Sequence, residues 1–131
     1  MEILEEIRVI TGIIAGVLAL FEMTAFIARR IKKVNLRLLR GKTHMRVGIA
    51  MIILAVIHGI IAVITALSEG LTLAMVVTLI TGFLSLGLCI GILFTYRGRK
   101  KHKKWLAVHL VFSIIMVVVT VIHIVFNGIV A

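Results

Sequence analysis

Proline is absent from this sequence of 131 residues, cysteine occurs once, and only 15% of the residues are charged. The lone cysteine, Cys89, has no partner, which excludes a disulfide scaffold and a thiol–disulfide relay. So little charge beside 62% hydrophobic residues excludes a disordered chain and a soluble domain, because a domain this small leaves much of its surface in water. A nucleotide- or flavin-binding domain does not fit beside membrane spans in this length.

What is present is apolar sequence in four long runs, each longer than the roughly 20 residues that cross a bilayer. The expected spans are Val9–Ala28, Thr43–Leu67, Leu71–Tyr96 and Trp105–Val130. The acidic start of the chain is unlike a secretory signal, so the first run is expected to be a helix of the mature protein. The fold class predicted is all-α, a four-helix transmembrane bundle forming a single domain over residues 1–131.

Positive charge is confined to two segments of the chain. Fourteen of the fifteen Lys and Arg residues lie between the first and second spans, in the first turn of the second span, or between the third and fourth spans. The first segment holds Arg29, Arg30, Lys32, Lys33, Arg37, Arg40, Lys42 and Arg46, and the second holds Arg97, Arg99, Lys100, Lys101, Lys103 and Lys104. The positive-inside rule predicts a multi-pass protein of a cell membrane, with both segments cytoplasmic and both termini outside. The compact basic loops and the lack of eukaryotic targeting signals favour a prokaryotic cell membrane. The partner indicated by this charge is anionic lipid rather than nucleic acid.

The chain also repeats at an offset of 65 residues. His44 falls on His109, Met51 falls on Met116, and the run ending at His58 falls on the run ending at His123. Chance matching is a real alternative in a sequence dominated by Ile, Val and Leu, but two aligned histidine pairs favour a repeat. Each half reads as two helices around a basic segment, so two parallel two-helix repeats are predicted, related by an axis along the membrane normal.

Four histidines stand at equal spacing, His44 and His58 in the second span and His109 and His123 in the fourth. Fourteen residues of helix come within about 40° of whole turns and rise about 21 Å, so each pair lies on one helix face at two depths. Because the two spans run in the same direction, His44 shares a level with His109, and His58 shares one with His123. The prediction is two stacked two-histidine sites.

Two histidines leave a structural zinc ion short of ligands, whereas heme iron needs only two axial ligands beyond its ring nitrogens. The spacing therefore favours two bis-histidine hemes along the membrane normal. The simpler alternative for any single histidine is a helix–helix hydrogen bond or a snorkelling interfacial group. The fifth histidine, His102, lies among lysines and is expected to be a solvated loop residue.

The segments from His44 to Gly59 and from Trp105 to His123 resemble the heme-binding helices of the ferric-reductase-like transmembrane domain. The paired histidines on the second and fourth helices are also similar to the four-helix core of quinol-oxidising cytochrome b. The resemblance implies a diheme b-type cytochrome with two hemes b per chain, in which His44, His58, His109 and His123 are the axial ligands. The chain departs from full-length ferric reductases by lacking a flavin and nicotinamide domain and two of their six spans.

Several further residues are candidates for supporting roles. For the heme nearer the basic segments, propionate partners are expected at Arg40, Lys42, Arg46 and Lys104. For the other heme the polar candidates are Arg8, Ser68 and Asn127. Small residues facing heme, or merely packing helices, are Gly12, Gly16, Gly82, Ser85, Gly87 and Gly91. Trp105 is expected to be an interfacial anchor.

Glu22 is the single acid inside an expected span, and pairing with Arg46 or a return to the interface is favoured over proton chemistry. The function predicted is transmembrane electron transfer, as a small cytochrome b or as the membrane subunit of a ferric-reductase-like or quinol-linked oxidoreductase, in a homo- or hetero-oligomer. Its donor would be a cytoplasmic flavoprotein or a quinol. The alternatives are a small proton-coupled multidrug-type exporter using Glu22 and a heme-free anchor subunit.

The charge distribution generates a topology prediction. A cysteine replacing Lys33 or Lys101 should be shielded from an impermeant thiol reagent in intact cells, whereas one replacing Glu69 should be labelled, because basic segments are retained in the cytoplasm. Labelling would be measured before and after permeabilisation. The opposite pattern would invert the orientation.

Overall fold

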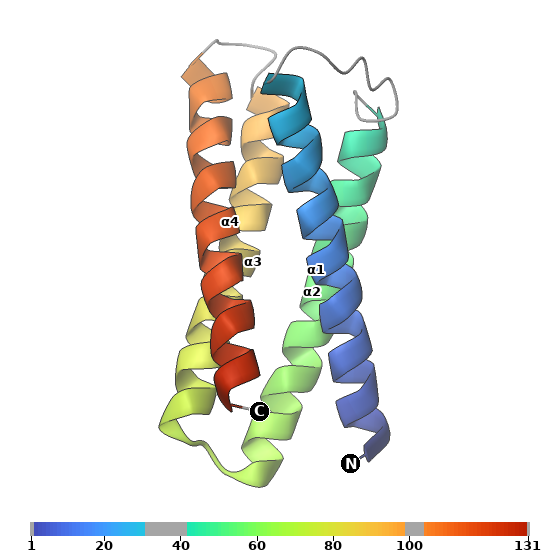
Figure 1. The fold of residues 1–131 in the computed structure, drawn as a ribbon, viewed down its shortest axis with the longest axis vertical. Helices are drawn as coiled ribbons and strands as arrows, with labels where there is room; N and C mark the ends of the chain where they lie inside the picture. The colour runs from blue at the N-terminus through green and yellow to red at the C-terminus, as the bar shows by residue number, and fades with distance from the viewer. Residues whose placement is uncertain (1, 31–41, 99–103, 131) are drawn as a thin grey trace.

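A computed structural model describes residues 2–30, 42–98 and 104–130. It consists of four helices in chain order, with no strand in these ranges (Figure 1). They are α1 (Glu2–Arg30), α2 (Lys42–Glu69), α3 (Leu73–Gly98) and α4 (Lys104–Val130). The predicted all-α four-helix bundle is confirmed. His102, Arg40 and most of the basic residues lie outside the described residues.

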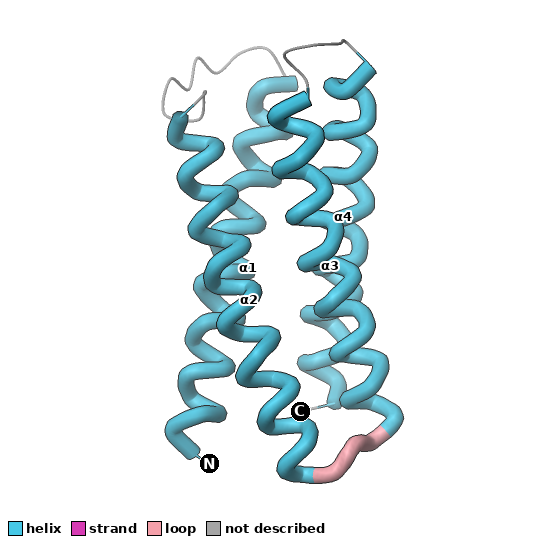
Figure 2. Tube along the Cα trace, turned by 180° about the vertical axis from the view of Figure 1, so that it is seen from behind, coloured by secondary structure: helices cyan, strands magenta, loops and turns pink. Residues whose placement is uncertain are grey.

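The helices pack mainly as two antiparallel pairs, α1 with α2 and α3 with α4. Contact between α2 and α3 is less extensive, and α1 barely meets α4, so α2 and α4 lie diagonally opposite each other. Both termini and the α2–α3 turn lie at one end, here called the termini end (Figures 1 and 2). The opposite end, from which the two basic segments extend, is called the loop end. This arrangement agrees with two parallel two-helix repeats.

The tight turn between α2 and α3 is specified by local sequence. Gly70 follows the last residue of α2 with a φ of 89°, a left-handed conformation in which glycine has no Cβ to strain. Thr72 precedes α3, and its Oγ1 accepts a hydrogen bond from the backbone N–H of Met75 at 3.2 Å. The cap and the glycine together reverse the chain within three residues.

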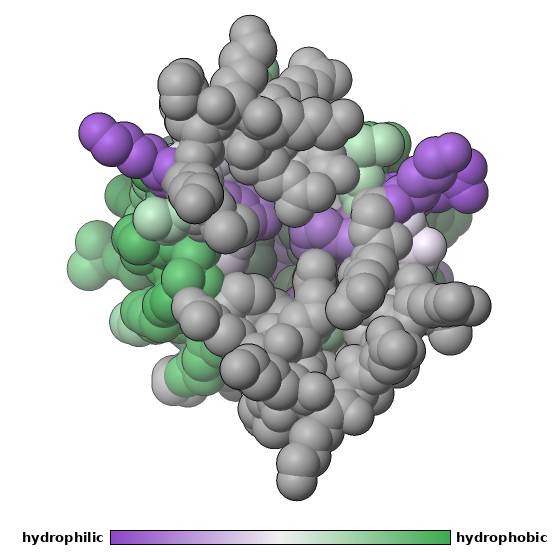
Figure 3. Space-filling model, turned by 90° about the horizontal axis from the view of Figure 1, so that it is seen from above, coloured by the Kyte–Doolittle hydropathy of each residue, from purple (hydrophilic) through white to green (hydrophobic). Residues whose placement is uncertain are grey.

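The distribution of residues is the reverse of that in a soluble protein. Large apolar side chains such as Ile13, Leu20, Ile60 and Val118 are exposed around the bundle, whereas Glu22 and Thr95 are buried. Viewed from the loop end, hydrophilic residues lie at the periphery and also in the centre between the helices, and hydrophobic residues cover one flank (Figure 3). Such a surface matches hydrocarbon rather than water.

Three helices are long and apolar enough to cross a membrane, over Lys42–Glu69, Leu73–Thr95 and Ala107–Asn127. The first expected span, Val9–Ala28, is not among the helices that qualify within the described residues. Charged residues occupy the beginning of α1 and Glu22 lies within it, which lowers its apolar character. The helix nevertheless lies along α2 as a full member of the bundle.

The interior at mid-height is occupied by sulfur-containing side chains. Met51, Cys89 and Met116 form a small buried cluster, in which the Cys89 Sγ donates to the Met116 Sδ at 3.2 Å. Met51 and Met116 each lie seven residues from both histidines of their helix, which is about 10.5 Å of helical rise. This cluster, here called the sulfur layer, separates the two histidine levels.

Candidate functional site

The four histidines meet as two pairs across the diagonal of the bundle. The rings of His44 and His109 have centroids 6.3 Å apart and planes at 82°. The rings of His58 and His123 also have centroids 6.3 Å apart, with planes at 89°. The partners in each pair come from α2 and α4, at the levels that the spacing predicts.

The separation of the rings can be compared with that of two imidazoles sharing one metal ion. Metal–nitrogen bonds of about 2.0–2.1 Å, and a ring with C–N bonds of about 1.33 Å, place the centroids about 6.3–6.5 Å apart when both Nε2 atoms bind opposite sides of the ion. The observed distance falls in this range at both levels. The same distance lies within the range of about 4.5–7 Å of edge-to-face ring pairs, and the internal repeat gives both levels the same geometry.

At the termini end, each Nδ1 atom contacts oxygen atoms of the neighbouring helix. The Nδ1 of His58 lies 2.9 Å from the carbonyl oxygen of Arg8 on α1. The Nδ1 of His123 lies 3.1 Å from the carbonyl oxygen of Thr78 and 3.1 Å from the Oγ1 of Thr81, both on α3. A carbonyl oxygen only accepts, so both rings carry a proton on Nδ1.

At the loop end, the same pattern uses side-chain acceptors. The Nδ1 of His44 contacts Oε2 of Glu22 on α1. The Nδ1 of His109 lies 3.1 Å from Oγ1 of Thr95 on α3. Thr95 donates its own hydroxyl hydrogen to the carbonyl of Ile92 at 2.8 Å, so its oxygen acts as the acceptor for His109. Acceptors on α1 and α3 thus favour the Nδ1-protonated tautomer in all four rings.

A metal-binding histidine characteristically donates its second ring N–H to a carboxylate or carbonyl, which fixes the ring and leaves the other nitrogen for the metal. His44, His58 and His123 have such an acceptor, whereas the acceptor of His109 is a hydroxyl oxygen. Across residues 2–30, 42–98 and 104–130, no cluster of three or more His, Cys, Asp and Glu could hold a metal ion. Each level therefore presents two imidazole rings as its potential metal ligands.

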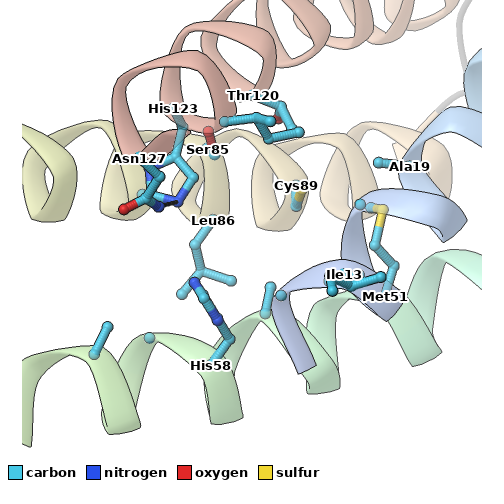
Figure 4. Close-up of a pocket in the computed structure, with 18 of the residues that line it drawn as sticks. Ile13, Ala19, Met51, His58, Ser85, Leu86, Cys89, Thr120, His123 and Asn127 are labelled. Atoms are coloured by element: carbon cyan, nitrogen blue, oxygen red, sulfur yellow. Dashed lines mark hydrogen bonds between the residues drawn. The ribbon is translucent and has the colours of Figure 1, made fainter. Parts of the chain in front are cut away.

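Space for a bulky group is present at the termini-end level. A cavity of about 540 Å³ is lined by residues of all four helices. It is lined mostly by small and apolar residues, and His58 and His123 point toward one another across it (Figure 4). Asn127 lies beside His123, with its amide nitrogen 3.4 Å from Nε2, as expected if that nitrogen accepts. Apolar cavities of this size with a few polar groups are typical ligand sites.

Two glycines allow the histidine rings to lie against the adjacent helices. A Cβ on Gly12 would lie 2.8 Å from Cε1 of His58, and one on Gly82 would lie 3.1 Å from Cε1 of His123. The remaining small residues differ in role. Gly91 makes room for Phe112, Gly16 has only an ordinary contact, and Gly87 faces open space. Gly12 and Gly82 therefore lie against the histidine rings, and the expectation that small residues face heme stays a prediction.

The structure corrects the expected partner of Glu22. This carboxyl group bonds to His44 and is 8% exposed, whereas Arg46 is exposed on α2. Glu22 turns inward because the Nδ1–H of His44 lies at its level and needs an acceptor in a medium without water. Pairing with Arg46 and a return to the interface were therefore both wrong.

Arg8 is also placed differently from its expected role as a side-chain partner of a cofactor. Its guanidinium pairs with Glu5 at the start of α1, and this hydrogen bond holds the pKa of the Glu5 carboxyl below its usual range. Its backbone carbonyl, in contrast, serves His58. Ser68 donates to the carbonyl of Thr65 at 2.8 Å. Lys42, Lys104 and Trp105 are exposed near the loop end.

The oxygens on α1 and α3 that accept hydrogen bonds from the histidines were not predicted, although the sequence contains signals for them. Ile-Thr-Gly ends at Gly12 and recurs ending at Gly82, an offset of 70 that extends the repeat to these helices. Thr11 and Thr81 each hydrogen-bond to carbonyls three and four residues earlier. Thr81 and Thr95 are fourteen residues apart, as are Arg8 and Glu22, which matches the spacing of the histidines.

Comparison with known proteins returns no match to a family model, to a curated protein or to a solved structure. The site must therefore be interpreted from its own geometry.

The close contact between Gly12 and the His58 ring can be tested by adding one methyl group at this position. Gly12→Ala should lower the free energy of unfolding by about 1–3 kcal/mol, because its Cβ displaces the His58 ring from a packed position. Gly16→Ala is the matched control in the same helix, where the nearest atom is 3.9 Å away and the helix gains about 0.5–1 kcal/mol. Thermal unfolding in detergent would compare them. If both variants changed the free energy of unfolding equally, the close contact between Gly12 and His58 would be contradicted.

Proposed function

We propose that this chain is a transmembrane electron-transfer protein that holds two b-type hemes. His44 and His109 would bind one iron, and His58 and His123 would bind the other. The observation that carries the proposal is the repetition of one geometry at two levels: a ring separation of 6.3 Å, with Nδ1 bonded to the neighbouring helix. The protein would act as a small cytochrome b or as the membrane subunit of an oxidoreductase.

The roles of the residues follow from their contacts. The four imidazoles would supply the nitrogens that hold the two irons, and the acceptors on α1 and α3 hold the rings in orientation. Gly12 and Gly82 let the rings lie close to those helices. Lys42, Arg46 and Lys104 are cations at the loop end suited to propionate groups. Bound heme supplies a one-electron redox couple.

The orientation in the membrane belongs to the same proposal. All four helices would cross the bilayer, α1 through its packing against α2, with the loop end cytoplasmic and the termini end outside. The levels are separated by about 21 Å of helical rise. They would carry electrons between a cytoplasmic flavoprotein or a membrane quinol and an acceptor on the other side. The prokaryotic cell membrane is the proposed location.

Heme content is the decisive test. The purified protein should be red, with a sharp reduced α-band and about two non-covalent hemes per chain, since two bis-histidine sites are available. The pyridine hemochrome assay would give the ratio of heme to protein. An exporter or an anchor subunit would give no such spectrum. A preparation that stays colourless after reconstitution with heme would refute the proposal.

The pairing of histidines gives a second test. His58→Ala and His123→Ala should each cost the same heme, lowering heme content from about two to about one per chain. The double variant should be little worse than either single variant, because both changes strike one site. His44→Ala combined with His58→Ala should remove both hemes. Reduced visible spectra and heme content would be measured, and additive losses from His58→Ala and His123→Ala would contradict the two-level arrangement.

A further inference from the structure

Three sulfur-containing side chains from three helices meet in the sulfur layer. Met51 on α2, Cys89 on α3 and Met116 on α4 are 8%, 8% and 6% exposed. The Sγ of Cys89 lies 3.2 Å from the Sδ of Met116, and Met51 packs in the same cluster. Cys89 is the only cysteine of the chain, and Met51 and Met116 are the buried methionines among the described residues. The layer therefore gathers one thiol and two thioethers in the interior of the bundle.

The internal repeat accounts for the composition of this layer. Met51 and Met116 are equivalent positions at the offset of 65, so they approach from α2 and α4 at one level. At the offset of 70 that relates α1 to α3, Cys89 corresponds to Ala19, which also packs against the layer. The thiol is therefore present on one side only, and the layer can supply a single negative charge.

The chemistry of the three sulfur atoms selects a class of metal ion. Thiolate and thioether sulfur are soft ligands that suit Cu(I). The charge balance points to the same ion. A monovalent cation that replaces the thiol proton of Cys89 leaves the site neutral, whereas a divalent cation would leave an unpaired positive charge in the hydrocarbon. Structural zinc also requires four ligands, one more than the layer provides.

The geometry needs only a small adjustment to hold such an ion. With metal–sulfur bonds of about 2.3 Å, two sulfur atoms on a trigonal ion lie about 4 Å apart, so those of Cys89 and Met116 must separate by about 0.8 Å. A methionine side chain has three rotatable bonds and adapts to such a shift. Met51 and Cys89 lie on the walls of the cavity of about 540 Å³ (Figure 4). The same cavity reaches Arg8 and Asn127 near the termini end, which provides a path of entry.

We propose that the sulfur layer binds one Cu(I) ion through the thiolate of Cys89 and the thioethers of Met51 and Met116. One S–H bond is replaced by one metal–sulfur bond, the proton is released to water, and the copper remains Cu(I). The site lies between the two histidine levels. The proposal goes beyond electron transfer through heme and does not depend on it, because none of the three ligands is a histidine.

Copper binding to the intact protein in detergent tests this site. The protein would be titrated with Cu(I), kept reduced by ascorbate, in competition with a chromophoric Cu(I) chelator. Wild type should retain one copper per chain that Cys89→Ser loses, because a hydroxyl has nearly the size of the thiol but is not a soft anionic ligand. Met51→Leu and Met116→Leu should each weaken binding by about tenfold or more, while conserving side-chain volume. Met45→Leu, at an exposed position of α2, is the control and should bind copper as wild type does.

The ligand atoms must be identified directly, because the imidazoles of His58 and His123 line the same cavity and also suit copper. X-ray absorption by the copper-loaded protein should show sulfur neighbours at about 2.3 Å from the metal. His58→Ala should leave this signal unchanged. Ag(I), another soft monovalent ion, should displace the copper, whereas Zn(II) should not.

Several outcomes would overturn the copper site. These are a wild-type protein that binds no copper, copper that Cys89→Ser retains in full, and bound copper whose neighbours are all nitrogen or oxygen. If thermal unfolding shows that Cys89→Ser does not fold, unchanged affinity in both Met51→Leu and Met116→Leu overturns the proposal in its place. Heme content is measured separately, so a failure of the copper site and a failure of the proposed function are distinguishable.

Discussion

Every imidazole N–H inside this bundle requires an acceptor, because the surrounding hydrocarbon offers none. The structure meets this requirement in the same way four times. Each Nδ1 contacts an oxygen of the helix that is antiparallel to its own, from α2 to α1 and from α4 to α3. These contacts hold each helix pair together. They also turn the edge of each ring that lies away from Nδ1 toward the space between α2 and α4. The remaining features of the site depend on that orientation.

The small residues and hydroxyls of α1 and α3 follow from the same constraint. A ring reaches a backbone carbonyl on the next helix only where that helix lies close, and Gly12 and Gly82 allow this approach. Further along, a side chain must extend to the ring instead, and Glu22 and Thr95 do so. Helices drawn together in pairs leave the centre open, and the cavity between His58 and His123 results. The sulfur layer at Met51, Cys89 and Met116 closes the bundle between the levels.

Much of this site could be predicted from periodicity alone. The spacing of His44 to His58, matched by His109 to His123, is enough to predict two levels once both helices run in the same direction. The acceptors were harder to predict, since a backbone carbonyl such as that of Arg8 carries no side-chain signature. Glu22 was expected to form an ion pair with Arg46, because a buried carboxylate usually pairs with a cation. Its level relative to His44 depends on how α1 lies against α2, across a segment whose length fixes no register.

The sequence by itself determined the helical class, the paired levels and the grouping of positive charge at one end, because these depend on composition and on the pitch of a helix. The sequence was less informative about α1, which was expected to cross the membrane. This helix combines apolar residues with charges and is not among the helices whose hydropathy alone predicts a span. Only the tertiary structure decided that α2 and α4 face each other diagonally, that the rings stand 6.3 Å apart, and that one level holds a carboxyl group. Those features depend on the rotation and offset of one helix against another, which side-chain contacts between the helices fix and the sequence of either helix alone does not.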